Sequence, residues 1–249
     1  LALLDQGFFD LILYADVEGS LPRNEMVTIM ARAGTCPVAL MDALDEFTDF
    51  RDRVATHLQF NDFAAYFKRE KHRAIDYGTN SYPLPFAYDQ RRALEASPTN
   101  PRESFFWAGH RMFGIRRLYL ESLEKHLGTT LDTMYTPEEY VQRIQGAAIG
   151  LNCFGMGFDT VRYWELPAHG TMLLSERLPI EIPYDFVDGE SAVFFDDLST
   201  LIEKLSYYET HPKETAEIAH AGHARYWQHH TNQARARQLL GWMEAGKIP

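Results

Sequence analysis

The fold is decided by the stretch "AIGLNCFGMGFDTVRYWELPAHGTMLLSE", residues Ala148–Glu176. It begins with the apolar run "AIGLNC" and ends with the apolar run "TMLLSE", and both runs are typical of buried strands. Between them a glycine-rich loop leads into a short helix that stops at Gly170. A strand, a helix and a second strand in this order predict two parallel strands joined by a crossover helix.

The same alternation continues toward the amino terminus. The runs "DLILYAD" (10–16) and "CPVALMD" (36–42) are typical of strands, and a third strand is expected at "HLQF" (57–60). The run "NDFAAYFKRE" (61–70) is expected to form a helix, because residues that favour helix caps precede its apolar positions.

Toward the carboxyl terminus the alternation is more regular. A strand is expected at "TLDTMY" (130–135), followed by a helix with Thr136 as its cap, Pro137 in its first turn and Glu139 closing a capping box. Further expected elements are the strands "SFFWAG" and "AVFF" and the helices "IRRLYLESLEKHLG", "LSTLIEKLSYYETH", "KETAEIAHAGHARYWQHH" and "NQARARQLLGWMEAG". The whole pattern predicts an α/β fold with doubly wound parallel sheets.

A change of composition divides the chain. The segment "EASPTNPRES" is rich in proline, serine and asparagine, which predicts a linker between about Ala96 and Arg102. We therefore expect one domain over residues 1–100 and a second over residues 101–249.

Composition narrows the function. The chain has 249 residues, 45% of them hydrophobic, which suffices for one large domain or two modest ones. Its formal net charge of −11 argues against nucleic acid or an anionic membrane as a general partner. No apolar run approaches the roughly 20 residues of a transmembrane segment, and no signal peptide is visible. We expect Cys36 and Cys153 to be buried thiols rather than a disulfide or metal site, which suits a cytoplasmic protein.

The predicted sheet topology points to a binding site. Ligands of open parallel sheets bind outside the carboxyl ends of the strands, and the loop after "AIGLNC" lies at such an end. Gly155 and Gly157 would let a ligand approach the backbone closely, and the following helix terminus favours an anion. Asp159 and Thr160, where the loop enters the helix, are therefore expected to lie at the ligand site. The alternative is that Asp159 or Thr160 caps that terminus.

Two side chains in the first turns of the same helix could contact a ligand. Arg162 and Glu165 are three residues apart and share one helical face. An arginine there suits phosphate, and a glutamate one turn deeper suits a pair of sugar hydroxyls. The alternative is an ion pair between the two that supports only the helix.

A second basic cluster follows the predicted strand "SFFWAG". It contains His110, Arg111, Arg116 and Arg117. Solvated charge at a helix start is one explanation. Arginine-bearing loops at the ends of neighbouring strands are better explained by a shared anionic ligand.

Five segments in order carry a family resemblance: "FFWAGHR..GIRRLYLESL", "YVQRIQGAAIGLN", "GFDTVRYWELPAHGTMLLSE", "DFVDGESAVFFDDLSTLIEKL" and "AEIAHAGHARYWQHHTNQARARQLL". With them the second half resembles the donor-binding domain of GT-B glycosyltransferases, in the family-1-like group that includes spore-maturation-type proteins. The resemblance implies two Rossmann-like domains facing a cleft, the first incomplete and on the acceptor side. It also implies a nucleotide-diphosphate sugar as donor and hexosyltransferase-type activity on an unknown acceptor.

The resemblance also assigns residues. Glu165 matches the family's ribose-binding glutamate, and Gly109, Arg111 and Arg116 match the segment that binds the diphosphate. Gly157 stands where related transferases carry a glutamate that touches the donor sugar. The ending "H-T-x-x-x-R" matches at residues 230, 231 and 235, and the last helix of the family often returns to the first domain.

The reaction implied is metal-independent and needs no cofactor. GT-B enzymes generally stabilise the departing diphosphate with a helix terminus and basic side chains. Asp16 and Asp45, near predicted strand ends of the first domain, are candidates for a catalytic base. The acidic run "DALDEFTDFRD" (42–52) is interpreted as a polar loop with helix caps, and "WQHH" as surface histidines. A nucleotide-sugar epimerase or a non-catalytic interaction module on the same fold remain alternatives.

Overall fold

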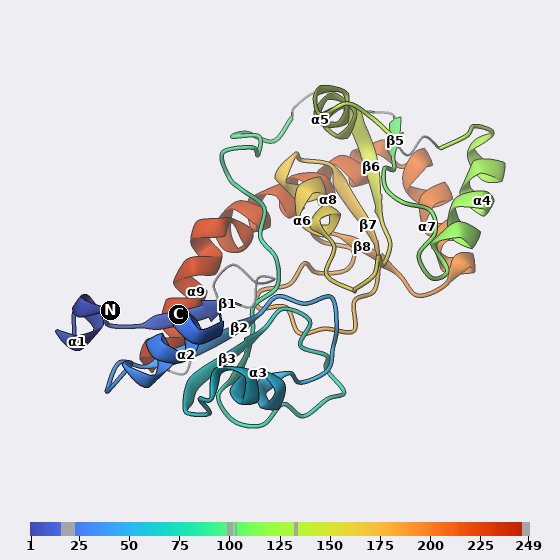
Figure 1. Ribbon diagram of the computed structural model, residues 1–249. Coiled ribbons are helices and arrows are strands. Elements are labelled where there is room, and N and C mark those ends of the chain that lie inside the picture. Colours follow the sequence, from blue (N-terminus) through green and yellow to red (C-terminus); the bar gives the residue numbers. More distant parts are fainter. Residues whose placement is uncertain (16–22, 99–101, 103, 132–133, 246–249) are drawn as a thin grey trace. The chain divides into compact units, whose positions relative to one another are not determined.

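The computed structural model describes residues 1–249 except 16–22, 99–101, 103, 132–133 and 246–249 (Figure 1). The chain forms two compact units. Unit 1 comprises Leu1–Pro85, Pro179–Pro183 and Arg237–Pro249, and unit 2 comprises Phe86–Leu178 and Tyr184–Ala236. The predicted linker lies partly outside the described residues, and the domain boundary at residue 100 stays a prediction.

Unit 1 is built on a four-stranded parallel sheet with the order β1-β2-β3-β4. Its strands are β1 (Ile12–Ala15), β2 (Val38–Asp42), β3 (Phe63–Lys68) and β4 (Ser81–Pro83), and its helices before β4 are α1 (Ala2–Asp5), α2 (Arg23–Ala31) and α3 (Arg51–Leu58).

Two expectations for unit 1 were wrong. The run "NDFAAYFKRE" forms strand β3 and not a helix, because Phe63–Lys68 pairs with β2 on one side and β4 on the other. An apolar run this short fits a buried strand and a buried helix equally well, so pairing decides. The expected strand "HLQF" is instead the end of α3, where Gln59 takes a left-handed conformation (φ 53°).

The two faces of this sheet have different cover. On one face strands β1, β2 and β3 pack with α2 and α3 around Leu40, Leu58 and Tyr66. On the other face Phe67 packs with Trp242 of α9 (Asn232–Ala245). The part of α9 from Arg237 onward thus belongs to the core of unit 1.

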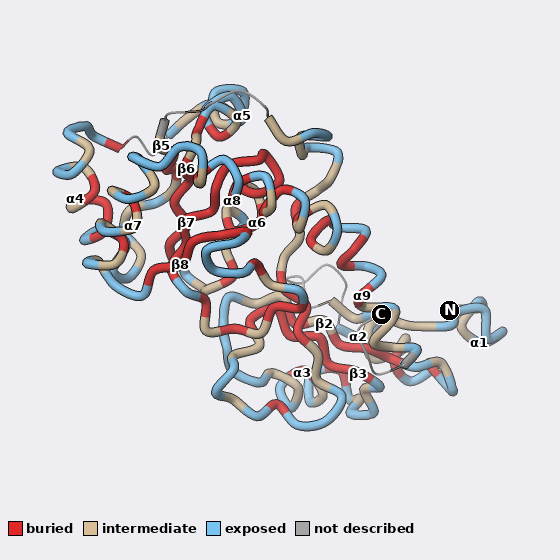
Figure 2. Tube along the Cα trace, turned by 180° about the vertical axis from the view of Figure 1, so that it is seen from behind, coloured by how far each residue is buried: buried red, intermediate tan, exposed pale blue. Residues whose placement is uncertain are grey.

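Unit 2 contains a second four-stranded parallel sheet, with the order β5-β6-β7-β8. Figure 2 shows its inner strands as the buried centre of the unit. The strands are β5 (Ser104–Phe106), β6 (Ala147–Asn152), β7 (Met172–Glu176) and β8 (Val193–Phe195). The helices are α4 (Arg116–Leu127), α5 (Pro137–Gly146), α6 (Val161–Ala168), α7 (Leu198–Thr210), α8 (Pro212–Arg225), the π-helix η1 (Tyr226–His230) and the start of α9. Two parallel sheets with helices between their strands confirm the predicted α/β fold class.

The stretch that opened the sequence analysis forms β6, α6 and β7, as predicted. Helix α6 lies so close to β6 that a Cβ added to Gly150 would come within 2.0 Å of Leu166 Cδ2. Glycine therefore sets the distance between helix and strand, and with it the position of the loop that joins them. The capping box at Thr136 and Glu139 is also present at the start of α5.

Some expectations find only partial or no structural counterpart. The strand expected at "TLDTMY" includes residues 132 and 133, which lie outside the described residues. Cys153 is buried, whereas Cys36 is partly exposed, and both are free thiols. Of the run "WQHH", His230 is fully buried, so these histidines are not all on the surface. Among the described helices, none is long and apolar enough to cross a membrane.

Candidate functional site

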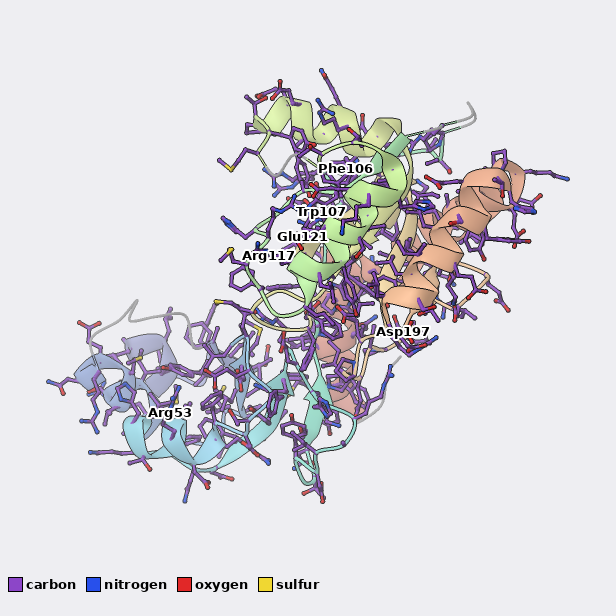
Figure 3. All side chains as sticks on the ribbon, turned by 90° about the vertical axis from the view of Figure 1, so that its right-hand side faces the viewer. Arg53, Phe106, Trp107, Arg117, Glu121 and Asp197 are labelled. Carbon is purple, nitrogen blue, oxygen red and sulfur yellow. The ribbon has the colours of Figure 1, made fainter. Side chains whose placement is uncertain are left out.

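An aromatic ring lies at the carboxyl end of the first strand of unit 2. Trp107 directly follows β5 and is 1% exposed (Figure 3). The guanidinium carbons of Arg116 and Arg162 lie over its ring, 5.1 and 4.6 Å from the centroid. Cation–π contacts of this kind keep the two positive groups close together at one ring.

Arg116 ties together the loops that follow β5 and β6. Its Nη1 donates to the carbonyl oxygen of His110 and its Nη2 to that of Cys153, each at 2.8 Å. Its Nε is buried without a partner among the described residues. Burial, followed by the charge of Arg162, lowers the pKa of Arg116. Because backbone carbonyls carry no net charge, these bonds do not neutralise Arg116, and its positive charge can still attract an anionic ligand.

Arg162 lies against the backbone of the β5–α4 loop. Gly109 has φ +143°, and a Cβ there would lie 2.8 Å from Arg162 Nη2. Glycine at 109 is thus required by both conformation and space. Within the described part of the chain, neither Arg116 nor Arg162 forms a salt bridge.

The amino terminus of α6 has no side-chain cap in this structure. Thr160 is the N-cap residue, but its hydroxyl donates to Asn152 Oδ1 at 2.5 Å instead of capping the helix. Asp159 accepts from the amide of Phe86 at 2.6 Å and from Trp164 Nε1 at 2.8 Å. The Thr160 side chain therefore does not cap the helix, whose first amides still favour an anion.

Glu165 lies one turn further into α6 and faces α5. Its Oε2 accepts a hydrogen bond from the Tyr140 hydroxyl at 2.6 Å. Burial raises the pKa of Glu165, opposed by the bond to Tyr140 and by the charge of Arg162. In the described structure no ion pair joins Arg162 to Glu165, so the alternative of a simple helix-supporting pair is not what these side chains form.

The remaining candidates of the basic cluster are engaged elsewhere. Arg111 forms a two-pronged salt bridge with Glu124, at 2.7 and 2.8 Å. Arg117 lies on the exposed side of α4, where it pairs with Glu121 (Figure 3). In the β6–α6 loop, the carbonyl of Gly157 accepts from the amide of Gly155 at 2.9 Å, which closes a tight turn.

Of the two candidates for a catalytic base, Asp45 belongs to unit 1. Asp45 forms a salt bridge with Arg69 and keeps 40% of its side chain exposed. Asp16 lies outside the described residues. No cluster of histidine, cysteine, aspartate and glutamate suited to a metal ion occurs among the residues that the structure describes.

Most of unit 2 matches the model of a known protein family. The profile described as "Glycosyl transferase-like" matches residues 108–241, more than half of the chain. The chain belongs to the glycosyl transferase-like family. This confirms the resemblance, and with it the expectation that the protein is a transferase enzyme.

Solved structures agree on the fold of this glycosyltransferase. HepE from Anabaena, determined with UDP and glucose, superimposes with a TM-score of 0.62 at 12% identity, over 98% of this chain and 81% of HepE. A glycosyltransferase from Rickettsia africae gives a TM-score of 0.63 at 8% identity, over 98% and 78% of the two chains. An alpha-glucosyltransferase determined with UDP-glucose and DNA containing an abasic site gives 0.59 at 8% identity, over 97% and 83%. No curated protein matches the sequence.

Sequence reasoning missed three side chains of this candidate site: Trp107, Tyr140 and Asn152. Trp107 carried a usable signal, because it directly follows a predicted strand at the ligand-binding edge. Tyr140 carried no such signal, since its contact is with Glu165, which lies on another helix 25 residues further along the chain. Asn152 closes β6, but only the fold shows that it holds the hydroxyl of Thr160.

Proposed function

We propose that this glycosyltransferase moves a sugar from a nucleotide-diphosphate sugar to an acceptor, and that unit 2 binds the donor at the carboxyl ends of β5 and β6. The observation that carries the proposal is the pair of guanidinium groups over Trp107, beside an uncapped helix terminus. Two cations without carboxylate partners among the described residues are costly to a fold unless an anion compensates them.

The assignment of the diphosphate follows from these contacts. We assign it to Arg116, Arg162 and the first amides of α6, with the Gly109 and Gly157 loops allowing close approach. Arg111 stays a candidate, but its salt bridge with Glu124 makes it a weaker one than Arg162. Arg116 would act by its fixed charge and by holding both loops in place.

The chemistry expected of these residues is electrostatic. Transfer breaks the bond between the anomeric carbon and the diphosphate oxygen, and negative charge grows on that oxygen. Donors that are already in place stabilise such charge without reorganisation. Arg162 supplies a positive charge at this edge, and its Nε has no hydrogen-bond partner among the described residues. Asp45 and Asp16 remain proposals for the base that deprotonates the acceptor.

The ribose is assigned to Glu165. Its Oε2 accepts from Tyr140, so we propose that Oε1 accepts from at least one ribose hydroxyl. A charge-assisted bond of this kind contributes about 1.5–3 kcal/mol.

We also propose that the enzyme is cytoplasmic and does not bind nucleic acid. The formal net charge of −11 supports the second point, and the two free thiols support the first.

Thermal shift with UDP, ADP and GDP tests the donor site, because a nucleotide that binds only the folded state raises the melting temperature. UDP is tested first, since HepE was determined with it. The nucleotide that binds is then supplied as its glucose or N-acetylglucosamine conjugate. Release of free sugar or transfer to an added acceptor supports the proposal, whereas formation of an epimer would show the other chemistry. Failure of all three nucleotides to bind would refute it.

A further inference from the structure

A hydrogen bond between two helices holds the carboxylate proposed to bind ribose. The Tyr140 hydroxyl, on α5, donates to Glu165 Oε2, on α6, at 2.6 Å. This distance is typical of a hydroxyl bonded to a carboxylate, which is the stronger, charge-assisted kind. No hydrogen bond to Glu165 Oε1 occurs within the described part of the chain.

Packing fixes the position of the phenol. Helix α5 begins at a capping box, and Tyr140 follows within its first turns. The edge of its ring meets Phe106, with centroids 5.3 Å apart and planes at 84°. Phe106 ends β5, next to Trp107. The ring that orients Glu165 is therefore set by the same strand that places the two arginines.

One charged neighbour of this pair also lies on the donor side. The charge of Arg162 favours the ionised forms of both the Tyr140 phenol and the Glu165 carboxylate, and so opposes the rise in pKa that burial causes in each. A buried carboxylate with a single phenol donor is a costly way to join two helices, because apolar side chains of similar volume would do so with less desolvation. The pair is better explained by a ligand than by stability.

We infer that Tyr140 is a positioning residue of the donor site, whose phenol orients Glu165 so that Oε1 faces the ribose hydroxyls. This inference rests on the proposed function, since it assumes a nucleotide at the site. It differs from the expectation that both carboxylate oxygens serve the ribose alone, because Oε2 is already held by the protein. Ribose recognition then depends on a residue of α5 as well as on α6.

The test compares Tyr140→Phe with the native enzyme, using UDP and 2′,3′-dideoxyuridine diphosphate as probes in calorimetric titrations. Loss of the orienting bond is expected to raise the dissociation constant of UDP about fivefold to tenfold, and that of the dideoxy probe less than about twofold. If another nucleotide of the UDP, ADP and GDP panel binds more tightly, it and its dideoxy form replace these probes. The double variant Tyr140→Phe/Glu165→Gln should bind UDP no more weakly than Glu165→Gln alone, because both changes act on one interaction.

Tyr207→Phe is the matched control. Its hydroxyl also donates to a glutamate, Glu214, at 2.9 Å, but between α7 and α8. This variant should bind both probes like the native enzyme.

Three results would overturn the role of Tyr140. They are unchanged UDP binding by Tyr140→Phe, tighter UDP binding, and equal losses for both probes. The second would mean that the phenol competes with ribose, and the third that the change only loosens the fold. If the native enzyme binds none of the three nucleotides, the proposed function itself fails, and the inference fails with it.

Discussion

The strongest prediction concerns Arg162→Met. Methionine keeps much of the length of the side chain over Trp107 but removes the charge. The native guanidinium lies 4.6 Å from the ring centroid, a contact worth about 0.5–2 kcal/mol. A sulfur–aromatic contact returns about 0.3–1.5 kcal/mol of this. The free energy of unfolding should therefore change by less than about 2 kcal/mol.

The effect on the ligand should be larger. A lost charge-assisted bond to the diphosphate costs about 1.5–3 kcal/mol, and each 1.4 kcal/mol is about tenfold in the dissociation constant. UDP should therefore bind about 10-fold to 150-fold more weakly, while uridine, which has no phosphate, should bind as before. Because Coulomb attraction is screened by salt, the loss should shrink as ionic strength rises.

Calorimetric titration of UDP and uridine measures both effects, and urea unfolding measures the stability. Arg117→Met is the control, because it removes an arginine that pairs with Glu121 on the exposed side of α4. It should leave both ligands unaffected. Unchanged UDP binding by Arg162→Met, or equal losses for UDP and uridine, would refute the assignment of the diphosphate to Arg162.

Other predictions follow from single contacts. Glu165→Gln should weaken the binding of UDP at least about tenfold by loss of a charge-assisted bond, with little change in the melting temperature. Calorimetry with the dideoxy nucleotide should show no such loss of binding. Burial, together with the charge of Arg102, lowers the pKa of His169 from 6.5 to about 4. Below pH 6.5 the unfolded chain therefore binds a proton at His169 that the folded protein does not bind, so His169 should contribute about 2 kcal/mol less stability at pH 5 than at pH 7.5. Burial also lowers the pKa values of His223 and His230, which add to the loss that urea unfolding measures; a flat profile would contradict this. Gly150→Ala should cost about 1–3 kcal/mol of stability in the same assay, because the added Cβ would press on Leu166. Gly146→Ala, where a Cβ meets nothing within 4 Å, is its control and should cost nothing.

The fold class and several elements followed from the sequence alone. Strand β6, helix α6 and strand β7 have local signals that agree with one another: apolar runs of strand length, a glycine-rich loop and a glycine stop. The capping box of α5 is equally local, since its partners are three residues apart. The sequence also predicts a ligand-binding edge, because parallel strands put their carboxyl ends on one side, and this edge stays a prediction.

Tertiary structure decided what local patterns leave open. The run that forms β3 has no period that separates strand from helix, and pairing with β2 and β4 settles it. The partners of the arginines were equally undetermined: Arg111 turns to Glu124, whereas Arg162 turns to Trp107. A charged residue near a strand end has many acceptors within reach, and only the packed fold selects one. For the same reason the bond from Tyr140 to Glu165 could not be predicted. It depends on how α5 and α6 pack in the fold, and strand β6 separates these two helices in the sequence.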